Sequence, residues 1–463
     1  MRVRPFFAAC VLVWMAGCGG PRPQQGAICT SPQGTTTPTS AVVVPQPAPV
    51  SAPSAPRPQP TASPNAGSTL EVDPANDAFI RDLLDSTHQG KGHYKVLAIS
   101  AGGQWGAYGA GVLAGLDAAG KVPDFRLVTG ISTGALLAPL MFLGDYEGAK
   151  QLYTSITSDD IYRTRPLSEL ITANSLLDSS PLRRKVGTVL TPEIIEHIRR
   201  ENIDNHRVLA VQSVDIDAGV SVVFDLTAIA ADKYRPCGEQ VSARDCIIHA
   251  VIAAAAIPVA FPPEFIQGDM YVDGGLRQYA FSIKVALEAV HHRSRLSSLL
   301  SVTHGPRRLP TGGPTEPDSR PIALTLIANT DFVVLPQCVG NGILPIAERA
   351  AGVALDQLSI GSFYRLMSET LEQPSDKARF TYADPALTKC TLPASSGSAL
   401  EAFDQGYMRC LFKAACIAAS NGEEIWHYNP DDLPESPAVG VVPTPSAAAV
   451  VPRTVPAICE VPG

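Results

Sequence analysis

The most constraining feature of the sequence is a repeated order of apolar strand, glycine-containing turn and helix. Tyr94 to Ser100 (YKVLAIS) predicts a buried strand, followed by a glycine-rich turn and a helix of small residues from about Gly106 to Ala119. Arg126 to Gly130 predicts a second strand, which leads through a turn at Ser132 into an apolar helix ending near Leu143. Two such units in succession indicate strands that are covered by helices.

The same alternation continues along the chain. Later strands are predicted at Val208 to Asp215, Ser221 to Leu226, Met270 to Val272 and Ile322 to Asn329. Helices are predicted at Pro192 to Glu201, Ile247 to Ala256, Ile346 to Leu371 and Ala402 to Ser420. Strands separated by helices favour a three-layer α/β/α fold with a largely parallel central sheet.

The two ends of the chain differ from its middle. Residues 1–17 carry Arg2 and Arg4 before an apolar run too short to span a bilayer, which predicts an export signal. Met15 to Cys18 resembles the bacterial lipobox, which implies cleavage before Cys18 and acylation of that cysteine; the alternative is a plain secretory signal. Residues 18–75 and 431–463 are rich in Pro, Ser, Thr and Ala and predict a tether and a tail around one domain at residues 76–430.

Export agrees with the cysteine content. Without Cys10 and Cys18, eight cysteines remain, an even number that favours disulfides in an oxidising compartment. Cys237 and Cys246 bracket a short polar loop and are the predicted local pair. Neither a Cys-x-x-Cys nor a His-Glu-x-x-His spacing occurs in the sequence, so we expect no metal site and no cofactor. We expect a membrane-anchored protein that faces the periplasm or the cell surface.

Charge restricts the partners. The formal net charge is −8 and no Lys/Arg-rich run occurs, which argues against nucleic acid and against electrostatic adhesion to anionic lipid. Association with a membrane would therefore come from the lipid anchor or from an apolar surface around a site.

Ser132 is the candidate nucleophile. It lies in a Gly-x-Ser-x-Gly frame between Gly130 and Gly134, after a predicted strand and before a predicted helix. At such an elbow the two glycines avoid the collisions that Cβ atoms would make. A serine hydroxyl also needs a base and donors for the oxyanion. A turn of small residues without catalytic function would have the same pattern.

The glycine-rich loop at residues 99–116 is the candidate anion site. Backbone N–H groups of Gly102 and Gly103, together with that of Thr133, are the predicted oxyanion donors. A dinucleotide site requires Gly-x-Gly-x-x-Gly directly after the strand, but the matching register starts at Gly109, within the predicted helix. Alternatively, the glycines only permit close packing of the helix on the sheet.

Asp273 is the candidate base. It ends the predicted strand in MYVDGGLRQ and is followed by Gly274 and Gly275. A carboxylate at a strand end beside a flexible turn can approach the end of another strand and accept the Ser132 proton. A polar turn after a strand explains the same residues without chemistry.

Together, the glycine loop, Gly-x-Ser-x-Gly and Asp-Gly-Gly resemble the patatin-like phospholipase family. Two further segments are similar to that family: Ala253 to Pro263, which contains Phe-Pro-Pro, and Asp178 to Val186, which contains Pro-Leu-Arg. The resemblance implies a three-layer α/β fold, a Ser132–Asp273 dyad, Gly102 and Gly103 in the oxyanion loop, and a lipid ester as substrate. The expected reaction is phospholipase A-like or lysophospholipase-like hydrolysis.

The chain departs from the family in the oxyanion loop. The usual Gly-Gly-Gly-x-Arg/Lys-Gly is replaced by Ala101 to Gly106 (AGGQWG), which lacks the first glycine and the basic residue. Trp105 either offers an apolar surface to an acyl chain or packs within the protein. The alternative function is a weakly active or inactive lipid-binding lipoprotein with the same fold. A histidine downstream of Ser132 would complete a triad instead of a dyad, but none lies in a recognisable motif.

Overall fold

The computed structural model describes residues 74–87, 92–170, 173–281, 320–333, 339–391, 403–422, 424–430, 433 and 455–461. The predicted signal peptide, Cys18, nearly all of the tether and most of the tail lie outside these residues. Within them, no helix is both long and apolar enough to cross a membrane.

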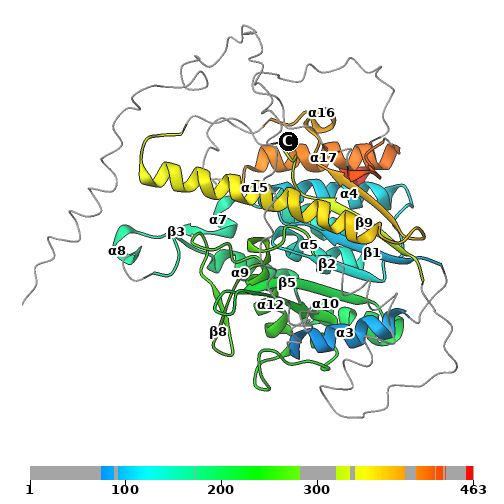
Figure 1. The fold of residues 1–463 in the computed structure, drawn as a ribbon, viewed down its shortest axis with the longest axis horizontal. Coiled ribbons are helices and arrows are strands. Elements are labelled where there is room, and N and C mark those ends of the chain that lie inside the picture. Colours follow the sequence, from blue (N-terminus) through cyan, green and yellow to red (C-terminus); the bar gives the residue numbers. More distant parts are fainter. Residues whose placement is uncertain are drawn as a thin grey trace, which may run out of the picture.

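The core of the fold is a mixed, largely parallel sheet (Figure 1). Its strand order is β10-β9-β1-β2-β5-β8-β7, and β6 also pairs with β5. The strands are β1 (Tyr94–Ile99), β2 (Leu127–Gly130), β5 (Val208–Asp215), β6 (Val220–Asp225), β7 (Glu264–Ile266), β8 (Asp269–Asp273), β9 (Ile322–Ala328) and β10 (Lys377–Tyr382). The five strands from β10 to β5 are parallel, whereas β6, β7 and β8 are paired antiparallel. The predicted α/β class and the largely parallel sheet are confirmed.

Helices cover both faces of the sheet. The principal helices are α3 (Pro74–Thr87), α4 (Gly106–Ala118), α5 (Thr133–Leu143), α6 (Tyr146–Thr154), α7 (Ser158–Ile161), α9 (Ser180–Val189), α10 (Pro192–Asn205), α11 (Leu226–Ala230), α12 (Ala243–Ala254), α15 (Ile343–Thr370) and α17 (Gln405–Asn421). Shorter elements are β3 (Arg163–Thr164), β4 (Leu177–Asp178), α8 (Leu167–Leu170), α16 (Pro385–Thr388) and the 3-10 turns Gly103–Trp105, Gly274–Leu276 and Ala457–Cys459.

Successive side chains of β1 point to opposite faces of the sheet and belong to two separate parts of the core. Leu97 and Ile99 point into a cluster formed with α4, α5, α12 and α17. Val96 and Ala98 point into a second cluster formed with α3 and α15. Each strand residue is buried on one face or the other, which explains why the strand is apolar throughout. The result is the predicted arrangement of three layers.

Three disulfides join described segments. The predicted pair Cys237–Cys246 is present. Cys390–Cys410 and Cys416–Cys459 are additional pairs that the sequence did not assign. The last of these fixes the segment 455–461 to α17, and Cys459 is fully buried there. Cys29 and Cys338 lie outside the described residues.

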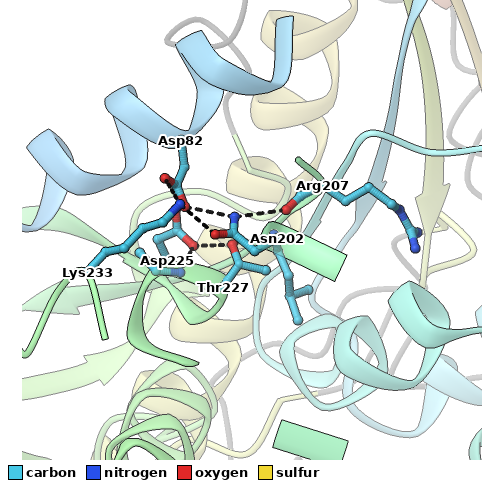
Figure 2. Close-up of polar contacts among 8 residues, drawn as sticks. Asp82, Asn202, Arg207, Asp225, Thr227 and Lys233 are labelled. Carbon is cyan, nitrogen blue, oxygen red and sulfur yellow. Dashed lines mark hydrogen bonds and ion pairs between the residues drawn. The ribbon is translucent and has the colours of Figure 1, made fainter. Parts of the chain in front are cut away.

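Helix α3 is attached to the domain by a buried polar network (Figure 2). Asp82 on α3 accepts hydrogen bonds from Asn202 Nδ2 at 2.9 Å and from Lys233 Nζ at 2.8 Å. Asp225 at the end of β6 accepts the Ala228 N–H at 2.8 Å and the Thr227 hydroxyl. Its Oδ2 is buried without a hydrogen bond among the described residues, and Figure 2 shows the two carboxyl groups turned toward one another. Burial, and then the Asp82 charge, raise the pKa of Asp225 to about 7.

Candidate active site

Ser132 lies at a strained turn between β2 and α5. Its backbone has φ 53° and ψ −120°, a left-handed conformation that is uncommon for a residue with a side chain. A Cβ at Gly130 would lie 2.2 Å from the Gly134 carbonyl oxygen, and one at Gly134 would lie 2.3 Å from the Ile99 carbonyl oxygen. Both positions therefore require glycine, and the frame forms the predicted elbow.

Strand register brings Asp273 to this elbow. Gly130 at the end of β2 pairs with Val211 of β5, and Asp273 at the end of β8 pairs with Ser213 of β5. Residues of β6 occupy the opposite edge of β5 at both positions, so β2 and β8 follow one another along the same edge. Because β8 runs antiparallel to β5, its last residue points back toward the end of β2.

The end of α12 holds both residues in place. The Ser132 N–H donates to the Ala254 carbonyl at 3.0 Å, and the Asp273 N–H donates to the Ala256 carbonyl at 2.8 Å. A Cβ at Gly274 would lie 2.3 Å from the Gln212 carbonyl oxygen, so the first glycine after Asp273 is required by close packing on β5. The backbones of Ser132 and Asp273 are thus fixed to a common support.

The Asp273 carboxyl is buried and partly satisfied. Its Oδ1 accepts the Gly275 N–H at 2.7 Å. Burial raises the pKa of Asp273 to about 6, and hydrogen bonds from the Ser132 hydroxyl and the Gly275 N–H act in the opposite direction. The contact with Ser132 is not of ideal geometry, since Asp273 Oδ2 accepts no well-formed hydrogen bond within the described chain. A buried carboxylate with a raised pKa beside a hydroxyl is a stronger base than a carboxylate in water.

The glycine loop lies beside Ser132. Gly103, Ser132 and Thr133 line one small cavity of about 40 Å³. The N–H groups of Gly103 and Thr133 donate no hydrogen bond to any described residue, so they are available to an oxyanion. Gly102 instead faces Asn329, whose carbonyl oxygen would lie 1.9 Å from a Cβ at that position. Of the predicted oxyanion donors, the structure therefore brings Gly103 and Thr133 to the cavity.

Gly106, the first residue of α4, packs directly against Thr133, the first residue of α5. A Cβ at Gly106 would lie 2.5 Å from Thr133 Oγ1 and 2.6 Å from the ring of Tyr153. The Thr133 hydroxyl is hydrogen-bonded to the Tyr153 hydroxyl, which also donates to the Thr133 carbonyl at 3.2 Å. The absence of a side chain at Gly106 thus allows α4 to approach the start of α5.

The remaining wall of the cavity is apolar. It comes from α5, α6, α7, α9, the segment after α12 and the segment before α17, and is formed by Leu136, Leu152, Tyr153, Ile156, Ile161, Leu182, Val186, Ala255, Ile257, Phe261 and Phe403. The two additional family-like segments identified in the sequence both contribute to it: residues 178–186 through Leu182 and Val186, and residues 253–263 through Ala255, Ile257 and Phe261. The site is chemically suited to an uncharged acyl group next to Ser132.

The unusual loop residues Gln104 and Trp105 attach the loop to α17. Gln104 is buried, and its Oε1 accepts the Asp404 N–H at 3.1 Å. The Trp105 ring packs edge-to-face on Tyr407 with ring centroids 5.3 Å apart. Trp105 therefore packs within the protein, which is one of the two alternatives that the sequence left open. No local pattern indicates these partners, since they lie about 300 residues away along the chain.

The described histidines that follow Ser132 in the chain have other contacts. His249 is hydrogen-bonded to Glu264, His197 lies 3.8 Å from Glu201, and His427 stacks on Phe380. His206 caps α10 in a left-handed conformation. None of these contacts involves Ser132 or Asp273. His88, His291, His292 and His304 lie outside the described residues.

Asn329, the buried residue directly after β9, was not among the predicted site residues. Its backbone N–H donates to Ser100 Oγ at 2.8 Å and its Nδ2 donates to the Ser100 carbonyl at 2.9 Å. The predicted strand ended at this residue, but a single Asn at a strand end carries no recognisable motif. Its hydrogen bonds to Ser100 and its close approach to Gly102 show that it lies against the glycine loop.

Comparisons with known proteins give a family match and a structural match. Residues 97–287 match the sequence model of the patatin-like phospholipase family. VipD from Legionella pneumophila is a similar solved structure, 12% identical, with 70% of this chain and 68% of that chain covered and a TM-score of 0.32. That score is too low to define a common fold, so the fold is defined by the strand order described above. No curated protein matches the chain.

Proposed function

We propose that this chain, whose residues 97–287 match the patatin-like phospholipase family, is a serine hydrolase that cleaves acyl esters of lipids. Ser132 is the nucleophile and Asp273 is the base. The observation that carries the proposal is the register of β2 and β8 on one edge of β5, which brings the strained serine and the buried carboxyl together.

In the first step, Asp273 accepts the Ser132 proton as Oγ attacks the ester carbonyl carbon. The carbonyl oxygen gains negative charge, which the N–H groups of Gly103 and Thr133 stabilise from the loop and from the start of α5. Collapse of the tetrahedral species expels the alcohol, which takes the proton from Asp273. The product of this step is an acyl group on Ser132.

In the second step, water attacks the acyl-enzyme. Asp273 accepts a proton from the water, and as the resulting tetrahedral species releases the fatty acid, Asp273 returns that proton to the departing Ser132 Oγ. The raised pKa of Asp273 makes the carboxylate more basic, and that pKa of about 6 still leaves most of it ionised at neutral pH. No other described side chain is required as a base.

The apolar wall supports a lipid acyl group as the substrate portion that lies beside Ser132. Its cavity of about 40 Å³ is small, so a long acyl chain would require the surrounding side chains to move apart. Among the described residues, the lining of this cavity is apolar apart from Ser132, Thr133 and Tyr153. No charged side chain of this lining therefore selects the head group or the acyl position.

The test is product analysis with a mixed phospholipid and lysophospholipid extract. We expect free fatty acid and the matching deacylated lipid from the wild-type protein, and neither product from Ser132→Ala. Ser155→Ala is a matched control, because Ser155 lies at the end of α6 and bonds only to the Gln151 carbonyl in the described structure. A folded wild-type protein that binds lipid without releasing fatty acid would favour the lipid-binding alternative.

We also propose that the protein is exported and anchored through an acylated Cys18. The three disulfides among the described residues support an oxidising compartment. Growth of an expressing bacterium with an alkyne-tagged fatty acid tests the anchor. We expect incorporation of the tag into the wild-type protein and loss of the tag in Cys18→Ala, with Cys10→Ala as the control; equal incorporation in Cys18→Ala would exclude this anchor.

A further inference from the structure

Asn329 lies where β9 ends against the loop that follows β1. Ile327 of β9 pairs with Ile99 of β1, and Asn329, two residues beyond Ile327, is hydrogen-bonded to Ser100, the residue that follows Ile99. The side chain is fully buried. It is therefore at the edge of the sheet where the carboxyl ends of the parallel strands meet, which is also where Ser132 follows β2.

Asn329 binds the backbone of the glycine loop from two directions. Its N–H donates to Ser100 Oγ at 2.8 Å, and its Nδ2 donates to the Ser100 carbonyl at 2.9 Å. Its own carbonyl oxygen lies so close to Gly102 that a Cβ there would approach it to 1.9 Å. Gly102 has φ 146°, a conformation that favours glycine. The loop can thus adopt its observed position only with glycine at position 102, where the backbone packs against the Asn329 carbonyl.

Helix α4 also lies directly against this side chain. A Cβ at Gly109 would approach Asn329 Oδ1 to 2.6 Å. Oδ1 is buried and accepts no hydrogen bond from the described residues, and leaving a buried acceptor unpaired is unfavourable. An apolar side chain at this position would avoid the unpaired oxygen. We therefore attribute the presence of an amide to its Nδ2 group, which donates to the Ser100 carbonyl.

Tyr279 connects the same residue to the segment after Asp273. The Tyr279 hydroxyl donates to the Asn329 carbonyl at 2.7 Å, and the Tyr279 carbonyl accepts the Ala101 N–H at 2.9 Å. Three segments therefore meet at Asn329: the glycine loop, the end of β9 and the segment that follows the Asp-Gly-Gly turn. None of these contacts uses the Gly103 N–H, and Gly103 lines the same cavity as Ser132.

We propose that Asn329 is a positioning residue that sets the glycine loop for oxyanion binding, an inference that rests on the proposed hydrolase function. It does not contact the substrate. It acts by fixing Ser100 and Gly102, and through them the direction of the Gly103 N–H. A displacement of about 1 Å in such a donor is sufficient to reduce turnover about 10²-fold.

The test compares Asn329→Ala with Asn202→Ala. Asn202 is also buried and its Nδ2 also donates to a backbone carbonyl, but it lies on α10 in the network around Asp82. For Asn329→Ala we expect kcat for a soluble ester, and the rate of labelling by a fluorophosphonate, to fall between about 10-fold and 100-fold. KM and the midpoint of the acid limb of the pH profile should stay at the wild-type values, because the acyl cavity and Asp273 are unchanged. Complete final labelling would show that the variant is folded.

A second measurement does not depend on activity. Amide hydrogen exchange in the peptide covering residues 100–106 should accelerate in Asn329→Ala and stay at the wild-type rate in Asn202→Ala. Gly102→Ala should accelerate the same peptide, since its Cβ would displace the loop from the Asn329 carbonyl. Wild-type labelling and exchange rates in Asn329→Ala would overturn the inference, as would an equal loss of rate in Asn202→Ala. If the wild-type protein is inert toward esters and the probe, the proposed function fails, and exchange alone decides whether Asn329 holds the loop.

Discussion

Asp273 pairs with Ser213 in the antiparallel register of β8 and β5, and Ser213 Oγ donates to the neighbouring Val272 carbonyl at 2.6 Å. This pairing determines where the Asp273 carboxyl lies relative to Ser132, because the end of β2, which leads into the Ser132 elbow, also pairs with β5. The position of the base is therefore a property of the sheet, and the predictions below follow from the groups that the sheet brings together.

Replacing Asp273 with Asn should lower kcat/KM for a soluble ester by about 10²-fold to 10⁴-fold, the range that general-base catalysis supplies. The wild-type pH profile should rise through pH 6 as Asp273 loses its proton, since burial raises the pKa of this carboxyl to about 6. Steady-state rates between pH 4.5 and 9 measure both effects. An acid limb that persists near pH 6 in Asp273→Asn would assign it to another group.

Substituting Gly134 with Ala should destabilise the protein by about 1–3 kcal/mol and abolish most activity. The added Cβ would lie 2.3 Å from the Ile99 carbonyl oxygen, and neither backbone segment can move without disturbing the elbow. Gly352→Ala is the control, because nothing lies within 4 Å of its Cβ position on α15. Thermal unfolding should show unchanged or slightly raised stability for the control, and an equally stable, active Gly134→Ala would contradict the close contact.

The Asp82–Asp225 network predicts a pH-dependent stability. Burial and the Asp82 charge raise the pKa of Asp225 to about 7, above the unfolded value of about 3.9. The folded state therefore binds more protons between these values, so this contribution to the free energy of unfolding is present below pH 4 and is lost as the pH rises through 7.

Urea unfolding of wild type and Asp225→Asn between pH 4 and 8 measures that contribution. We expect a shallower pH dependence in the variant and a relative gain in stability near pH 8, because Asn does not titrate and its amide can donate to Asp82. In Asp82→Asn the loss of this contribution to the free energy of unfolding should shift to lower pH, since a charge that raises the pKa of Asp225 is removed. Parallel pH dependences for wild type and Asp225→Asn would contradict the assignment.

The Cys416–Cys459 disulfide should stabilise the fold more than Cys237–Cys246. The two bonds join residues 43 and 9 positions apart, respectively. On the loop-entropy account, replacing Cys416 and Cys459 with Ser should cost about 4 kcal/mol, and replacing Cys237 and Cys246 about 2.5 kcal/mol. Denaturant unfolding of the two double variants provides the comparison, and a larger loss from the shorter loop would show that chain entropy does not dominate.

The sequence predicted the elements that are defined by local pattern. Tyr94 to Ser100 and Val208 to Asp215 are continuous apolar runs, and both are buried strands. The Gly-x-Ser-x-Gly pattern around Ser132 was sufficient to predict the turn, because the close approach of strand and helix requires glycine at positions 130 and 134. Strand β10 (KARFTY) was missed, although its alternation of polar and buried residues was a usable signal at the edge of the sheet.

Long-range partners could not be predicted in the same way. The contact of Gln104 with Asp404, and that of Asn329 with Ser100, join positions more than 200 residues apart. Each depends on which strands and helices become neighbours, and a single Gln or Asn has no periodicity that reveals its partner. The sequence therefore indicated that the loop departs from the family pattern, whereas the structure shows what supports the altered loop.

The most direct test of the account is the site of covalent labelling by a fluorophosphonate, located by peptide mass spectrometry. The account predicts one adduct, on Ser132, that forms slowly in Asp273→Asn and not at all in Ser132→Ala. An adduct on another serine, or wild-type labelling kinetics in Asp273→Asn, would contradict the claim that these two residues share the proton transferred during ester cleavage.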